Sequence, residues 1–315
     1  MQRREFVKAG AGAVAMLSAM SACTPKSQSR AAATNSTVEG SQRLAKIGLQ
    51  LSTVTTLMLR DFEGTLKWVA GIGYDQVEFS ALGFLGRDTT AVRKLLAELN
   101  LEAPQGRVSP VLPSDFMGLP RDKQMAVYRE RARPEYLLDN VAYSLEAATE
   151  LGQRYLILPA MMPDSFQSLK QVTQNIELIN QAGEMCHKQG VVFGYHNHNW
   201  EFSPLEGVIP YDLMLESTDP ESVTFQLDAY WVAKAGGDLS QYIAQFPGRF
   251  SSCHMKDIDS AGDFADVGDG LIDFPRFTRQ ALAAGSQYFF VERDNPPNPA
   301  ESIQRSYTYL RQMTF

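Results

Sequence analysis

The segment KQGVVFGYHNH, residues 188–198, indicates the fold most directly. Lys188 and Gly190 are typical of the end of a helix, because a cation favours the negative end of the helix dipole and glycine readily adopts the left-handed conformation that follows it. An apolar run comes next and ends in His196 and His198. A helix, a glycine and then a buried strand with polar residues at its carboxyl end form one unit of an alternating β/α protein.

The same alternation extends outward along the chain in both directions. Short apolar runs predict eight strands, at residues 46–52, 76–80, 101–109, 154–159, 191–198, 223–228, 250–256 and 287–292. Amphipathic patterns predict helices between and after them, at residues 62–71, 90–99, 135–151, 169–188, 239–245, 274–284 and 300–310. This pattern favours an α/β fold of a single domain, a (β/α)8 TIM barrel. A doubly wound open sheet is the alternative, but no glycine-rich phosphate fingerprint follows the first strand.

The first 23 residues have the order of a signal peptide, with a charged head, a modest apolar stretch and small residues at its end. Arg3 and Arg4 stand before Phe6, and the apolar stretch that follows is rich in alanine and glycine. The pair resembles the twin-arginine export signal. The alternative is an ordinary secretory signal in which the two arginines are accidental.

Residues 20–23, Met-Ser-Ala-Cys, resemble a lipobox and predict lipidation of Cys23. Residues 24–44 are rich in Ser, Ala and Thr without an apolar period, which is typical of a flexible tether. Residues 45–315 then form the barrel domain. We therefore expect an exported, periplasmic protein that contacts the membrane only through a lipid anchor.

Composition excludes several classes of protein. Hydrophobic residues make up 44% of the chain, which is enough for a globular core. The formal net charge of −7 argues against a nucleic-acid partner, because phosphate binding calls for a basic face. Cys186 and Cys253 are the two cysteines of the expected domain, one in a helical pattern and one in a strand, so no disulfide framework is predicted.

Polar residues end four consecutive predicted strands: His196 and His198 the fifth, Asp228 the sixth, His254 the seventh and Glu292 the eighth. Catalytic groups of a TIM barrel lie at the carboxyl ends of the strands. Imidazole and carboxylate ligands around one point suit one divalent ion, Mn, Co, Zn or Mg. Taken singly, a buried histidine is more often a hydrogen-bonded core residue, but three of the four histidines of the chain lie at these positions.

Several segments together resemble the sugar phosphate isomerase/epimerase-like family of the xylose isomerase-like TIM barrel superfamily. They are YHNHNWEF at 195–202, LDAYWVAKAG at 227–236, FPGRF at 246–250, HMKD at 254–257, VGDGLIDF at 267–274 and FVERD at 290–294. The resemblance implies that Asp228, His254 and Glu292 are metal ligands. It also implies substrate contacts at Trp231, Lys256 and Glu78.

The sequence departs from the family pattern at the fifth strand, where His196 stands in place of the usual metal-binding glutamate. Either His196 binds the metal, or Glu201 folds back from the next loop to supply a carboxylate. The family generally uses two glutamates as paired acid and base, of which Glu292 is present here. A neutral imidazole at His198, with a pKa near neutrality, is the expected partner base.

The resemblance implies an isomerase or epimerase that removes a proton next to the carbonyl of a sugar or keto-sugar. A keto-sugar or 3-keto-glycoside lyase, a dehydratase or a hydratase is the alternative on the same site. A sugar-binding lipoprotein without catalysis is the alternative of another class, and the ligand set argues against it. The partner is a small-molecule sugar, with assembly into a homo-oligomer left open.

Overall fold

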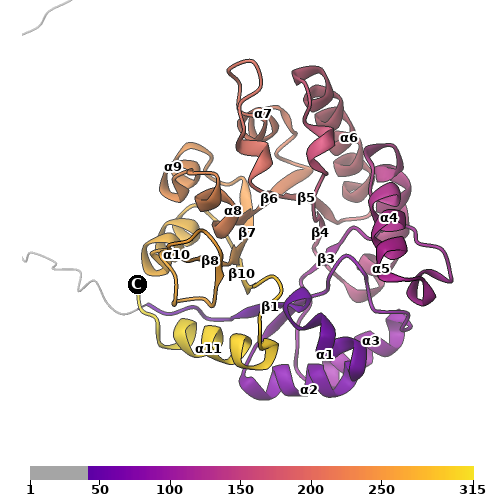
Figure 1. Cartoon of the computed structure of the whole chain (residues 1–315), viewed down its shortest axis with the longest axis vertical. Helices are drawn as coiled ribbons and strands as arrows, with labels where there is room; N and C mark the ends of the chain where they lie inside the picture. Colours follow the sequence, from indigo (N-terminus) through magenta and orange to yellow (C-terminus); the bar gives the residue numbers. More distant parts are fainter. Residues whose placement is uncertain (1–41) are drawn as a thin grey trace, which may run out of the picture. The chain divides into compact units, whose positions relative to one another are not determined.

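The computed structural model describes residues 42–315 and shows eight parallel strands surrounded by helices (Figure 1). The order around the sheet is β2-β1-β10-β7-β6-β5-β4-β3. Each predicted strand is present; β6 has the expected bounds and the other seven are shorter than expected. Their bounds are Gly48–Gln50 (β1), Gln76–Glu78 (β2), Gln105–Arg107 (β3), Tyr155–Leu158 (β4), Val192–His196 (β5), Val223–Asp228 (β6), Phe250–Met255 (β7) and Tyr288–Val291 (β10).

The strand order distinguishes a barrel from an open sheet. The last strand of the ring, β10, pairs in parallel with the first strand, β1, with Gly48 opposite Phe290. On the other side of β1, the ring continues to β2 and closes onto β3 through a parallel bridge between Gln76 and Glu102. The TIM barrel prediction is therefore confirmed as a nearly closed ring, and the doubly wound alternative is wrong.

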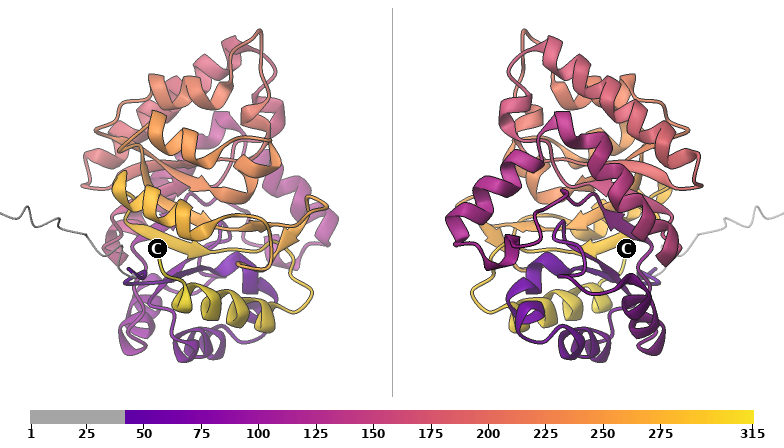
Figure 2. Two further views of the ribbon diagram at one scale, coloured as in Figure 1. Left: turned by 90° about the vertical axis from the view of Figure 1, so that its left-hand side faces the viewer. Right: turned by 90° about the vertical axis from the view of Figure 1, so that its right-hand side faces the viewer.

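Helices cover the outside of the strands, as the two side views show (Figure 2). The seven predicted helices are present with ends shifted by up to two residues: Phe62–Ile72 (α2), Thr89–Glu98 (α3), Leu137–Leu151 (α5), Leu169–His187 (α6), Leu239–Gln245 (α9), Phe274–Ala283 (α10) and Pro299–Gln312 (α11). Their ends follow local chemistry. Asp61 caps α2 by accepting from the backbone N–H of Gly64, and Gly190 has a φ of 74° between α6 and β5.

Four helices and one hairpin were not predicted. They are Thr55–Arg60 (α1), Arg121–Arg131 (α4), Pro210–Ser217 (α7), Ala229–Lys234 (α8) and the antiparallel pair Asp257–Ile258 (β8) with Phe264–Ala265 (β9). Two of them bear on the site. The short helix α8 begins immediately after Asp228, which caps it, and α4 lies in the connection between β3 and α5.

The side chains that alternate along the strands face two different environments. Outward-facing residues such as Tyr195, Leu227 and Met255 are buried under the helices. Cys186 and Cys253 are buried and free. Among residues 42–315, no helix has the length and apolar character needed to cross a membrane. The predicted signal peptide of residues 1–23, with Cys23, and most of the tether lie outside the described residues.

Candidate metal centre

Four residues converge at the carboxyl ends of four neighbouring strands. They are His196 of β5, Asp228 of β6, His254 of β7 and Glu292, directly after β10. One ligand atom from each lies within 4.8 Å of the others, and all four residues are buried. Because β5, β6, β7 and β10 are neighbours in the ring, the strand ends bring together residues separated by almost 100 positions in the sequence.

The free atoms of this group suit a divalent ion. Nδ1 of His196 lies 2.9 Å from the side-chain oxygen of Gln226. The other ring nitrogen, Nε2, faces Asp228 Oδ2 at 3.6 Å. Asp228 uses Oδ1 to cap α8, and its Oδ2 is buried without a hydrogen-bond partner among the described residues. His254 Nδ1 lies 2.8 Å from Glu292 Oε2 and 3.6 Å from the same Oδ2 of Asp228. The nearest cation to this oxygen, the Lys256 ammonium, is 3.8 Å away, beyond hydrogen-bond distance, so the donor set of two carboxylates and two imidazoles fits a metal.

A buried polar network contacts the other ring nitrogen of His254, Nε2. Glu78 Oε2 lies 2.7 Å from His254 Nε2, and Arg107 Nε donates to the other oxygen of Glu78 at 2.9 Å. Amide groups of Gln50 and Gln105 complete the shell, each at 2.8 Å from Glu78. Glu78 has no exposed surface. In this structure Glu78 therefore orients the His254 imidazole, and its predicted role as a substrate contact stays a prediction.

The charges of the group follow from burial and from these contacts. Burial, and then Arg107, lower the pKa of His196 well below its ordinary value, so this imidazole is neutral and ready to act as a ligand. Burial alone would lower the pKa of His254, but the carboxylates of Glu292 and Glu78 outweigh it and raise the pKa to about 10. Burial alone would raise the pKa of Glu292, and Lys256 and His254 instead hold it well below its usual range. Glu292 is therefore ionised.

Lys256 forms the wall of the group next to Glu292. Its ammonium donates to Glu292 at 3.0 Å and to Asp294 at 2.6 Å, and it lies 5.1 Å from the centre of the Trp231 ring. Although burial opposes it, the surrounding carboxylates, Glu292 first, raise the pKa of Lys256. The residue is thus a fixed positive charge beside the candidate ligands. Trp231 and Lys256, predicted as substrate contacts, are both brought to this wall.

Two polar residues of the site were not predicted. The Ser52 hydroxyl, just after β1, donates to Glu292 Oε1 at 2.8 Å and orients the carboxylate. Asp294 pairs with Lys256. Asp294 stands two positions after Glu292, so the alternation that placed Glu292 at the rim also pointed to it. Ser52 carried no comparable signal, because a serine after a strand is common in any loop.

Comparison with known proteins places this geometry in a family. A family model described as xylose isomerase-like TIM barrel matches residues 66–313. The chain belongs to this family. An inosose dehydratase of Geobacillus thermodenitrificans is 26% identical over 159 residues, which cover 44% of this chain and 53% of the relative. That match thus spans about half the length of the relative. An inosose dehydratase of Geobacillus kaustophilus is 22% identical over 280 residues, covering 78% of this chain and 83% of the relative.

Solved structures with the xylose isomerase-like barrel show the same fold. A sugar phosphate isomerase/epimerase from Parabacteroides distasonis has a TM-score of 0.70 at 24% identity, covering 84% of this chain and 96% of that chain. The IolI protein with a bound zinc atom has a TM-score of 0.61 at 14% identity, covering 84% of this chain and 95% of that chain. At these identities the likeness establishes the fold alone. It also shows that a protein with this barrel holds a divalent metal.

In this xylose isomerase-like barrel, Glu201 is not part of the metal group. Its carboxylate accepts from the Tyr195 hydroxyl at 2.6 Å and from the backbone N–H of His198 at 3.0 Å, both on the outward side of β5. Its side chain is fully buried there. Of the two predicted alternatives for the fifth-strand ligand, the structure places His196 in the group and Glu201 behind the strand.

His198 borders the metal group without joining it. Its ring stacks on Trp200 at 4.3 Å, lies 4.9 Å from the Trp231 ring and is 5.1 Å from the His196 ring. Burial, and then the ammonium of Lys256, lower the pKa of His198 to about 3. The expectation of a pKa near neutrality is therefore corrected, because the aromatic walls and the nearby cation disfavour a second positive charge. The imidazole is neutral, with Nδ1 buried and without a hydrogen-bond partner among residues 42–315.

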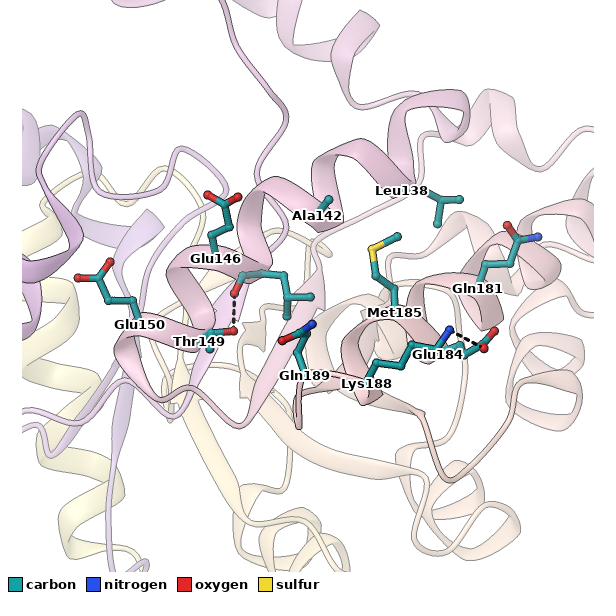
Figure 3. A pocket seen from close by; sticks show the side chains of 11 residues that line it. Leu138, Ala142, Glu146, Thr149, Glu150, Gln181, Glu184, Met185, Lys188 and Gln189 are labelled. Atoms are coloured by element: carbon teal, nitrogen blue, oxygen red, sulfur yellow. Dashed lines mark hydrogen bonds and ion pairs between the residues drawn. The ribbon is translucent and has the colours of Figure 1, made fainter.

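A separate groove of about 820 Å³ lies on the outer surface between α5 and α6 (Figure 3). Leu138, Ala142 and Met185 line it, and an ion pair of 2.8 Å between Lys188 and Glu184 lies at its edge. None of the predicted site residues borders this groove. Its size alone does not make it the reaction centre, because the convergent polar groups lie at the end of the barrel.

Proposed function

We propose that this protein is a metal-dependent enzyme that removes the proton next to the carbonyl of a sugar or keto-sugar, as an isomerase or epimerase. The observation that carries this proposal is the buried group of His196, Asp228, His254 and Glu292, with Lys256 beside it. These four residues would hold the metal. A divalent ion held there polarises a carbonyl oxygen and so lowers the barrier to loss of the neighbouring proton.

The side chains around the group have distinct parts in this step. Glu292 is ionised and oriented by Ser52, so it can accept the proton. Lys256 is a buried ammonium 3.0 Å from Glu292, and its positive charge would stabilise the substrate oxygen on which negative charge develops. His198 is neutral and offers a second acceptor on the side of Trp200 and Trp231. The aromatic rings exclude water from the reacting carbon and can stack on a sugar ring.

Elimination is a second candidate, and the fifth strand favours it. Epimerisation at one carbon requires a proton donor and a proton acceptor on opposite faces. At the end of β5, where the resemblance implied a glutamate, the chain has His196, which contacts Gln226. In an elimination, one base takes the proton next to the ketone, its electron pair forms a carbon–carbon double bond, and the bond to a β-oxygen breaks. The proton that the base has taken can pass to that oxygen, and the ammonium of Lys256 can stabilise its negative charge as it leaves. The curated dehydratase relatives catalyse a reaction of this class by name.

The test is deuterium incorporation in D₂O, followed by NMR, with manganese and matched sugars, keto-sugars and their glycosides. Exchange next to the carbonyl supports proton removal; its absence with every substrate would leave only sugar binding. The product then separates the two candidates, since an epimer or isomer keeps its oxygen atoms and an elimination product contains a new double bond.

Asp228→Asn is the sharpest variant for the metal. Asparagine is as good a helix cap as aspartate, so α8 is retained while a ligand oxygen is lost. We expect a loss of metal affinity larger than the roughly 10–100-fold typical of outer-shell changes, and a loss of exchange. Asp61→Asn makes the same change at the cap of α2, away from the group, and serves as the control. Equal metal content in both variants refutes the site.

His198→Ala tests the base. This variant should keep its metal, because His198 lies outside the group. It should slow exchange under saturating manganese, but by less than the roughly 10²–10⁴-fold of a base whose pKa is near the working pH, because the pKa of His198 is about 3. Exchange at the parental rate would transfer the proton-accepting role to Glu292 alone.

A further inference from the structure

A second, smaller cavity adjoins the metal centre on the side of His198. Its volume is about 240 Å³, and it lies at the carboxyl ends of β3, β4 and β5 beneath residues of α4 and α5. His198 lines this cavity, and its ring is 5.1 Å from that of His196. A molecule bound at the metal group therefore has this cavity next to it, with the His198 ring between the two spaces.

The walls of the cavity are largely apolar. Side chains of β3 and β4 and of the loops that follow them supply Val108, Leu158 and Met162. Asn140 lines the cavity too, but its amide is already occupied: Oδ1 accepts from the Val111 N–H at 2.8 Å and Nδ2 donates to the Arg131 carbonyl at 2.7 Å. The polar groups that remain are the Tyr128 hydroxyl and the His198 imidazole.

Tyr128 stays uncharged in this position. Burial raises the pKa of Tyr128 to about 12, although the guanidinium of Arg107 opposes the shift. The cavity thus has no charged group of its own and presents one hydroxyl and one imidazole among aliphatic side chains.

Size and wall chemistry decide what can occupy the space. An apolar protein cavity of about 150 Å³ is large enough to bind benzene, so this one admits an aromatic ring with a small substituent. A second sugar ring fits poorly, because its hydroxyl groups would lose their hydrogen bonds to water and find few partners here. An apolar group has no hydrogen bonds to water to lose when it enters the cavity, and its surface is removed from water.

We propose that this cavity is the subsite for an apolar or aromatic substituent of the substrate, so that the enzyme acts on a glycoside of a keto-sugar carrying such an aglycone. The inference rests on the proposed function for the position of the sugar ring at the metal group. In the elimination, the oxygen that leaves is the one that joins the sugar to this aglycone.

Binding of matched glycosides tests the subsite independently of turnover. Calorimetry on the manganese-loaded full chain compares the phenyl and methyl glycosides of the same keto-hexose. We expect the phenyl glycoside to bind about tenfold more tightly or better, because the additional ring buries apolar surface. Equal dissociation constants for the two glycosides would overturn the proposal.

Two substitutions at lining residues fill the cavity, Ala132→Phe at the end of α4 and Ala160→Leu after β4. Each should remove most of the phenyl preference while binding of the methyl glycoside stays within about twofold. Ala126→Phe is the matched control, since Ala126 is exposed on the same helix and does not line the cavity. Thermal unfolding shows which filled variants are folded. A parental preference in a folded filled variant refutes the subsite.

Deuterium exchange measured on the same two glycosides separates this inference from the proposed function. A phenyl preference without any exchange supports the cavity and refutes the proposed reaction. Exchange with equal affinities supports the reaction and refutes the cavity.

Discussion

At the end of β5, His196 occupies the position where the resemblance implied a glutamate, and Glu201 lies on the other side of the same strand. Because His196 Nε2 faces Asp228 at 3.6 Å, His196→Ala should lower metal content sharply. Glu201→Gln should leave metal content nearly unchanged, because its carboxylate contacts Tyr195 and the His198 backbone instead. Mass spectrometry of metal-loaded, desalted protein measures both. The reverse order of metal loss would show that Glu201 moves into the group when the ion binds.

Glu201 also predicts a dependence of stability on pH. Burial raises the pKa of Glu201 to about 8 from an ordinary 4.5, even though Tyr195 and the His198 backbone donate to it. The folded state therefore favours the protonated carboxyl. The stability that Glu201 contributes is fully present below the pKa that this residue has in the unfolded chain. That stability is lost as pH rises through the pKa of Glu201 in the folded state. The free energy of unfolding should fall between about pH 5 and pH 8, by up to roughly 4 kcal/mol from this residue.

Denaturant titrations across this range measure the effect. Glu201→Gln has no proton to lose, so its free energy of unfolding should decline less than that of the parent. Glu206→Gln, at an exposed position in the same loop, should keep the parental decline. Identical curves for parent and Glu201→Gln would mean that Glu201 is ionised in the fold throughout the range.

At the scale of elements, the close pairing of β1 with β10 depends on Gly48. A Cβ at this position would lie 2.3 Å from a ring carbon of Phe290, whose ring fills the barrel 6.4 Å from that of His254. Gly48→Ala must displace this ring and should lower the free energy of unfolding by about 1–3 kcal/mol. Gly71→Ala, on the exposed side of α2 with nothing within 4 Å, should raise it by up to about 1 kcal/mol. Urea denaturation compares them, and a gain in both variants would contradict the packing argument.

Some helices could be predicted from the sequence and others could not, and the difference lies in how their side chains are buried. The seven predicted helices have one apolar face against the barrel, which produces a helical period. The helix α4 buries none of its residues fully, so its polar sequence carries no such period. The helix α8 has six residues and begins directly after β6, so the apolar strand and the helix merge into one run. Short elements at the rim, where the site lies, are therefore the ones that pattern reasoning misses.

At the scale of the whole molecule, the sequence before residue 42 predicts where the protein resides. If Arg3, Arg4 and Cys23 act as an export signal and a lipid attachment site, the mature protein should fractionate with membranes. A chain that begins at Thr24 behind a cleavable signal should be released from them. Replacement of Arg3 and Arg4 by lysine should block export, as measured by immunoblots of cell fractions. Unchanged export of that variant would show an ordinary secretory signal and would leave the barrel domain unaffected.

The sequence by itself determined the succession of strands and helices, the barrel, and the placement of His196, Asp228, His254 and Glu292 at strand ends. These follow from local periodicity and from the rule that parallel strands present their carboxyl ends at one rim. Only the tertiary structure showed that His196 joins the group, that Glu201 lies on the other side of β5, and that Glu78 contacts the His254 ring. Those outcomes depend on which face of a strand a loop folds against and on which charges meet in the barrel interior. Contacts of that kind join distant segments of the chain, and sequence spacing does not record them.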